Sequence, residues 1–155
     1  MSTLTKTEKN SPITFQLKGI ELLESCLYHP KQDDLVFKVF HFEIKIDHQI
    51  NAEKKLFKAI ITTEIHNEQK DLKLGSITTN CIFEIVNISE YIDSQSKQVN
   101  LPEDFISTIN SITISTARGI MFDQFKGTYL HHALLPIVDP RAFVQQQKDK
   151  NLDSI

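Results

Sequence analysis

Arginine is scarce in this chain, and its scarcity argues against one class of function. Arg118 and Arg141 are the only arginines, and the other cations are lysines spread among acidic residues, giving a formal net charge of -3. Nucleic-acid recognition favours clustered cations for the phosphates and the guanidinium fork for the bases. We therefore expect no nucleic-acid partner.

Glycine and cysteine are also rare, with four and two copies. No glycine-rich motif that could hold a nucleotide phosphate is present. Cys26 and Cys81 lie far apart and form no CxxC pair, so a zinc knuckle or a redox pair has no support. Two buried, reduced thiols are the expectation, with a disulfide as the alternative. No cofactor is expected.

Long apolar runs are missing as well. The first residues lack the apolar core of a signal peptide, and no run is long enough to span a bilayer, so we expect a cytoplasmic protein with no direct membrane insertion. A chain of 155 residues suits one domain. We expect a flexible polar arm over 1–11, a folded domain over 12–144 and a polar tail over 145–155.

The first half of the chain alternates between apolar and polar residues. This pattern predicts four strands, at 13–28, 39–47, 57–65 and 72–86, joined by short polar turns into an antiparallel sheet. Gly19 and Gly75 stand where the alternation shifts by one residue, as a β-bulge would require.

The second half has helical spacing. A polar connection leads to a helix over 101–125, with Pro102 in its first turn and Gly119 marking a close contact or a weak point. A short second helix over 140–147 would close the domain. The predicted class is α+β, a four-stranded antiparallel sheet with a long and a short C-terminal helix. The apolar stripe of the long helix comprises Phe105, Ile109, Ile112, Thr116, Ala117 and Ile120.

The stretch GTYLHHALLPIVDP, at 127–140, holds the most suggestive polar residues. Adjacent side chains such as His131 and His132 diverge in a helix or a strand, so they do not easily share one metal ion. A triad could be assembled from Ser115, His132 and Asp139, but no nucleophile motif surrounds any serine. We expect no metal site and no catalytic residue, and hence no enzyme.

Apolar residues are in surplus around the same stretch. The second predicted strand has a face rich in Phe and Ile, and 127–140 adds further leucine, isoleucine and valine. These residues could all be core or subunit interface, or they could line a groove for an extended apolar peptide. Periodicity does not separate these alternatives.

Several segments together resemble the SecB family of bacterial export chaperones. ITFQLKGIELLESCLYHP (13–30), FEIKID (42–47) and CIFEI (81–85) are similar to three of that family's strands. ITISTARG (112–119) is similar to its long helix, and LLPIVDPRAF (134–143) to the segment that enters its last helix. The resemblance spans nearly the whole domain in the right order.

The resemblance implies an ATP-independent holdase that keeps unfolded preproteins competent for export and assembles as a homotetramer, a dimer of dimers. Acidic Glu24 matches a position that docks the SecA motor, whereas Tyr28 and Ser76 depart from that acidic pattern. The implied subunit contacts include Phe15, Leu17, Ile77 and Thr79. The implied client-binding residues are Phe42, Ile44, Ile46, Leu134, Leu135, Ile137 and Phe143.

Three alternatives stay open. A SecB-like chaperone could serve one partner, such as a toxin–antitoxin pair, instead of export. A carrier of small hydrophobic ligands could use the same apolar surface. An enzyme would need His131, His132 or Asp139 for its activity. In the chaperone interpretation, the two histidines are incidental or rim residues of a crossover between helices.

Overall fold

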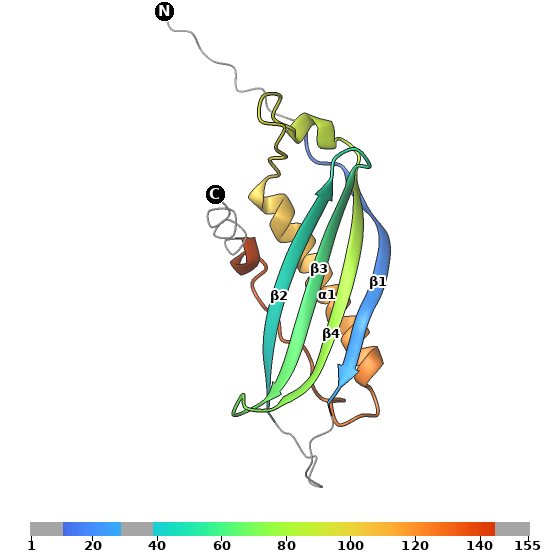
Figure 1. The fold of residues 1–155 in the computed structure, drawn as a ribbon, viewed down its shortest axis with the longest axis vertical. Helices are drawn as coiled ribbons and strands as arrows, with labels where there is room; N and C mark the ends of the chain where they lie inside the picture. Colours follow the sequence, from blue (N-terminus) through green and yellow to red (C-terminus); the bar gives the residue numbers. More distant parts are fainter. Residues whose placement is uncertain (1–10, 29–38, 145–155) are drawn as a thin grey trace, which may run out of the picture.

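The structure is a computed structural model that describes residues 11–28 and 39–144. Its strands are β1 (Phe15–Leu27), β2 (Phe40–Asn51), β3 (Leu56–Asn67) and β4 (Lys73–Ile85). They form one antiparallel sheet in the order β1-β4-β3-β2, and helix α1 (Glu103–Phe125) lies across one face of it (Figure 1). The predicted α+β class is confirmed.

Alternating burial shows why these segments form strands. Every second residue of β3 from Phe57 to Ile65 is buried against α1, and the residues between them are only partly covered. The β2–β3 ladder runs without a slip, so that Ile44 stands opposite Thr63 and Ile46 opposite Ile61. This register places the apolar row of β2 on the same face as α1, as the sequence predicted.

The two strand glycines act as predicted, and one further bulge appears. The β1–β4 register shifts between Leu17 and Gly19, and it shifts again before Glu24, where the sequence gives no glycine. At Gly75, the β3–β4 register shifts, and a Cβ atom would lie 3.0 Å from the carbonyl oxygen of Cys26 and 2.6 Å from Cδ1 of Leu130, which would have to move.

The buried face of helix α1 is slightly rotated about the helix axis relative to the predicted apolar stripe. Asn110, Thr113, Ile114, Met121 and Phe125 are buried, while the predicted stripe residues at 112, 116 and 120 are only half-buried. A serine- and threonine-rich helix leaves its face ambiguous from spacing alone, and the sheet selects the face that packs best.

Three further predictions about the second half need correction. Pro102 is the N-cap, just before the helix, because its backbone is extended (ψ 145°). Gly119 is exposed with nothing near it, so it marks no close contact. The connection before α1 is not merely polar, since a 3₁₀ helix (Ile88–Tyr91) buries Ile88 and Tyr91.

The core consists of two clusters along the length of the sheet. One gathers aromatic rings around Phe57, where Phe105 packs edge-on against both Phe57 and Phe15. The other surrounds Ile61 and Ile65 and includes Phe125 and Leu130. Because the second cluster contains residues beyond α1, the chain after the helix is part of the core.

The cysteines differ from each other, contrary to the expectation of two buried thiols. Both are free, but Cys26 is half-buried whereas Cys81 is fully buried. Burial raises the pKa of the Cys81 thiol, which keeps it protonated.

The ends of the chain are described only in part. The predicted arm over 1–11 lies outside the described residues except for Ser11, and the tail over 145–155 lies outside them entirely. The short second helix is present at 142–144, two residues later than predicted, and its remaining positions lie outside the described part. Among the described residues, no helix is long and apolar enough to cross a membrane.

Two phenylalanines on α1 test the packing. Phe125 is 1% exposed and Phe122 is 51% exposed. We expect Phe125→Ala to lower the free energy of unfolding by about 3–5 kcal/mol through the cavity it leaves. Phe122→Ala, its matched control, should change stability by less than about 1 kcal/mol. Urea titrations followed by circular dichroism would measure both, and equal losses would contradict the packing of α1.

Candidate functional site

The chain after α1 turns back and runs beside the helix and strand β2 (Figure 1). We call residues 133–144 the crossover segment. It is extended up to Asp139 and then enters the short helical turn. An extended segment without strand partners needs other hydrogen bonds to hold it.

Arg118 supplies two of these bonds. Its Nε donates to the carbonyl of Leu135 at 2.7 Å, and its Nη2 donates to the carbonyl of Pro136 at 2.9 Å. Neither of these two carbonyls lies in a β-strand, so neither accepts a hydrogen bond from a neighbouring strand. The planar guanidinium is suited to such paired contacts, which a lysine could not reproduce.

Asn110 supplies a second tether in the buried layer between α1 and β2. Its side chain is 0% exposed, and its Nδ2 donates to the carbonyl of Pro140 at 3.3 Å. Its Oδ1 lies 2.7 Å from Nε2 of His48, so His48 carries a proton on Nε2 and donates it. Helix, strand and crossover segment are thereby joined through one amide.

A third contact holds the chain where it turns back after α1. The hydroxyl of Tyr129 reaches the carbonyls of Tyr28, at 2.5 Å, and of Leu74, at 3.0 Å. Partial burial raises the pKa of this phenol, so the hydroxyl stays protonated and able to donate. The chain after α1 is thus held at Tyr129, just before the crossover segment, and within that segment at Leu135, Pro136 and Pro140.

The tethered segment leaves apolar side chains in solvent. Leu134 is 58% exposed and Ile137 is 94% exposed, although the intervening Leu135 is only 2% exposed. A cavity of about 250 Å³ lies between this segment and α1. Its lining residues, which we call the crossover groove, are Ser111, Ile114, Ser115, Arg118, Ile137 and Val138.

The structure divides the predicted client-binding residues into two groups. Phe42 and Ile44 are half-buried and pack on the core beside the crossover segment. Ile46, Leu135 and Phe143 are buried within the protomer. Only Leu134 and Ile137 are presented to solvent without any rearrangement, so a client would meet these two first.

The histidine pair takes no part in the groove. His131 and His132 are both exposed, and Nδ1 of His131 accepts a hydrogen bond from the Gly127 amide at 3.1 Å. Gly127 has a φ of 77°, which favours glycine, so this contact closes a turn after α1. His131 thus stabilises the local turn, and the His132 ring packs edge-on against the His131 ring.

The predicted interface residues are also divided. Phe15 is half-buried and Leu17 is 43% exposed, whereas Ile77 and Thr79 are buried beneath α1. Strand β1 exposes further apolar side chains, of which Ile20 is 50%, Leu22 43% and Leu23 53% exposed. This apolar flank, Leu17 to Leu23, is wider than the sequence indicated.

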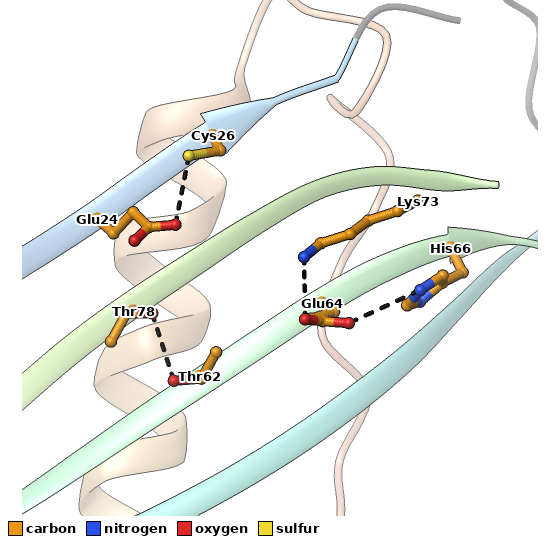
Figure 2. Close-up of polar contacts among 7 residues, drawn as sticks. All are labelled: Glu24, Cys26, Thr62, Glu64, His66, Lys73 and Thr78. Atoms are coloured by element: carbon orange, nitrogen blue, oxygen red, sulfur yellow. Dashed lines mark hydrogen bonds and ion pairs between the residues drawn. The ribbon is translucent and has the colours of Figure 1, made fainter.

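Glu24 lies on the face of the sheet opposite α1 (Figure 2). Its Oε1 accepts a hydrogen bond from the Cys26 thiol at 3.4 Å. Ser76 is 4% exposed beside Cys26 in the ladder, so it offers little surface. Docking of SecA through Glu24 stays a prediction.

Sequence reasoning missed Asn110 and His48. Asparagine inside a helical pattern and histidine in a strand look like solvated residues when read singly. Their pairing depends on α1 lying over β2 at this point, which neither local pattern contains. A helix-interior asparagine flanked by apolar Ile109 and Ile112 was the one available indication of burial.

Comparison with known proteins finds likeness in structure only. No protein-family model matches the chain, and no curated protein matches it in sequence. A SecB-like chaperone of Mycobacterium tuberculosis, solved with a ChAD peptide from the HigA1 antitoxin, matches with a TM-score of 0.51 and 13% identity, over 80% of this chain and 84% of that one. The fold of this chain is therefore SecB-like.

A second solved structure is more distant. A protein of unknown function from Streptococcus agalactiae matches with a TM-score of 0.39 and 8% identity, over 75% of this chain and 90% of that one. A score this low does not establish a shared fold.

The tethers of the crossover segment can be tested with Arg118→Met, which keeps an apolar side chain of similar length but removes both donors. We expect chymotrypsin to cut after Leu134 about tenfold faster, because a net loss of about 1–2 kcal/mol in local stability raises the open population by that order. Cleavage sites would be mapped by mass spectrometry.

The control is Arg141→Met, since Arg141 pairs only with exposed Asp139, at 2.9 Å. Surface pairs of this kind contribute little, so its cleavage rate should match that of the unaltered protein. Unchanged cleavage in Arg118→Met would show that the crossover segment does not depend on this side chain.

Proposed function

We propose that the protein is an ATP-independent holdase that binds unfolded or non-native polypeptides along the crossover groove and the exposed side of the crossover segment. The observation that carries this proposal is the presence of Leu134 and Ile137 in solvent on a segment that Arg118 and Asn110 hold in place. An apolar side chain that is 94% exposed on tethered backbone is unusual unless something covers it.

The arrangement suits extended, apolar clients. Preorganised apolar residues bind without first being ordered, so less of the binding energy is lost. The groove is shallow, so a single contact would be weak, and a long unfolded chain would gain affinity by occupying several sites at once. Neither a cofactor nor a catalytic residue is needed for this activity.

Binding to one dedicated partner is the second candidate. The solved SecB-like neighbour holds a peptide from an antitoxin. By analogy, this chain would bind one recurrent peptide and ignore generic unfolded proteins. Export of preproteins, docking to SecA through Glu24 and action in the cytoplasm belong to the first candidate and are proposed with it.

Assembly into a homotetramer is part of the proposal. Strand β1 is an edge of the sheet. Its apolar flank lies on the same face of the sheet as α1, but the helix does not cover it. A second copy that pairs along this edge would bury the flank and satisfy the open backbone groups of the strand. A dimer formed in this way supplies more than one groove per assembly.

The client proposal is tested with one polypeptide in two states. Reduced, carboxymethylated α-lactalbumin stays unfolded, and native α-lactalbumin serves as its folded counterpart. We expect nucleotide-free protein to bind the unfolded form, and Leu134→Ser with Ile137→Ser to weaken that binding about tenfold through lost apolar contact. Calorimetry would give the affinities.

The matched control is Val86→Ser, because Val86 is 44% exposed but lies just beyond the end of β4 and does not line the groove. Its affinity should be unchanged. Equal weakening by both variants would contradict the groove assignment. If the unaltered protein ignores both forms yet binds one peptide in an array of antitoxin C-terminal sequences, the dedicated-partner function replaces the general one.

The assembly is tested by light scattering after gel filtration. We expect a tetramer for the unaltered protein and a smaller species for Ile20→Asp, since a buried unpaired charge at the interface is costly. Glu21→Lys, on the opposite side of the same strand, is the control and should remain tetrameric. A monomeric unaltered protein at micromolar concentration would contradict the β1 interface.

A further inference from the structure

The face of the sheet opposite α1 carries a polar cluster that the proposed function does not use. Glu43 comes from β2, and Glu64 and His66 come from β3. One ligand atom from each of the three lies within 4.8 Å of the other two. Two carboxylates and an imidazole at this separation are a set of metal-ligating groups.

Strand register brings the cluster together. Glu43 stands directly opposite Glu64, and His41 stands directly opposite His66. Like charges placed directly opposite each other in a sheet are destabilising. Lys73 pairs with Glu64 on one side, and a cation between the two carboxylates would further reduce this repulsion.

His66 is incompletely satisfied in its surroundings. Its side chain is only 13% exposed, and its Nδ1 is buried without a hydrogen-bond partner. Its Nε2 lies 3.7 Å from Oε2 of Glu64, which is too long for a hydrogen bond. Zinc–ligand distances of about 2 Å place two ligands of one ion roughly 3–4 Å apart, so the gap between Nε2 and Oε2 is one that an ion would bridge.

Lys73 orients Glu64 and does not fill the cluster. Its Nζ donates to Oε1 of Glu64 at 2.9 Å, which leaves Oε2 directed toward His66 (Figure 2). The two carboxylate oxygens of Glu64 thus face different residues: Oε1 faces Lys73, and Oε2 faces His66. This is the arrangement in which a neighbouring donor fixes the direction of a metal-ligating carboxylate.

From this geometry we propose that Glu43, Glu64 and His66 form a binding site for a divalent transition-metal ion of the zinc type. A mixed set of nitrogen and oxygen ligands suits such ions, whereas Mg²⁺ and Ca²⁺ prefer oxygen alone. His41 is half-buried and stands opposite His66 in the ladder, but it is not among the three residues whose ligand atoms lie together.

The ion would join the edge strand to the sheet. Strand β2 has a neighbour on one side only, and Glu43 belongs to β2 while its partner ligands belong to β3. Metal bound across the two strands stabilises the folded state because the site does not exist in the unfolded chain. The site lies on the face opposite α1, so its success or failure is independent of client binding.

The test is calorimetric titration of tag-free protein with Zn²⁺ at about pH 7.5, where protons compete little for imidazole ligands. We expect one ion per chain, and a rise in Tm of about 5–10 °C when free Zn²⁺ is about 100 times its Kd. The combined change Glu43→Gln and His66→Gln should weaken binding about tenfold or more and remove the rise in Tm.

Two controls exclude other sources of zinc binding. His132→Gln removes an exposed imidazole outside the cluster, and Cys26→Ser removes a thiol on the same face of the sheet as the cluster. Both variants should bind as the unaltered protein does. Loss of binding in either control, with retention in the cluster variant, would overturn the proposal.

A measurement on the unaltered protein covers the case in which the cluster variant does not fold. Imidazole NMR resonances should shift for His66 at the first equivalent of Zn²⁺ and stay unchanged for His132. Absence of any shift at His66, or no measurable heat of binding, would show that the cluster holds no such metal.

Discussion

The packing of one helix on a four-stranded sheet is the constraint on which the rest of the structure depends. A helix is about 10 Å wide and strands are about 4.8 Å apart, so α1 can cover only about two of them. It covers β3 and β4, whose facing side chains are almost fully buried. The apolar rows of β2 and β1 on the same side need another cover.

The two flanks meet this need in different ways. The crossover segment covers β2, and because it is extended it requires the donors of Arg118 and Asn110 in place of a ladder. Nothing in the described part of the chain covers the apolar flank of β1. One flank therefore becomes a tethered apolar groove and the other an open edge, and both features follow from the width of a single helix.

Local patterns predicted much of the fold. The β2 row from Phe40 to Ile46 and the bulge at Gly19 follow from alternation, which responds to burial on one face of a strand. The exact face of α1 did not follow, because Ile112 and Ile114 have equal hydrophobicity and only the sheet distinguishes them. The resemblance to SecB predicted a four-stranded antiparallel sheet with C-terminal helices, and the structural match to a SecB-like chaperone agrees with this fold class.

The candidate sites divide in the same way. The sequence by itself determined that apolar residues gather between 130 and 144 and that strands precede one long helix, since these depend on neighbours along the chain. Only the tertiary structure decided that Ile137 is exposed while Leu135 is buried, that Asn110 meets His48, and that Glu43 faces Glu64 and His66. These outcomes depend on strand register and helix placement, which set the distances between residues far apart in sequence.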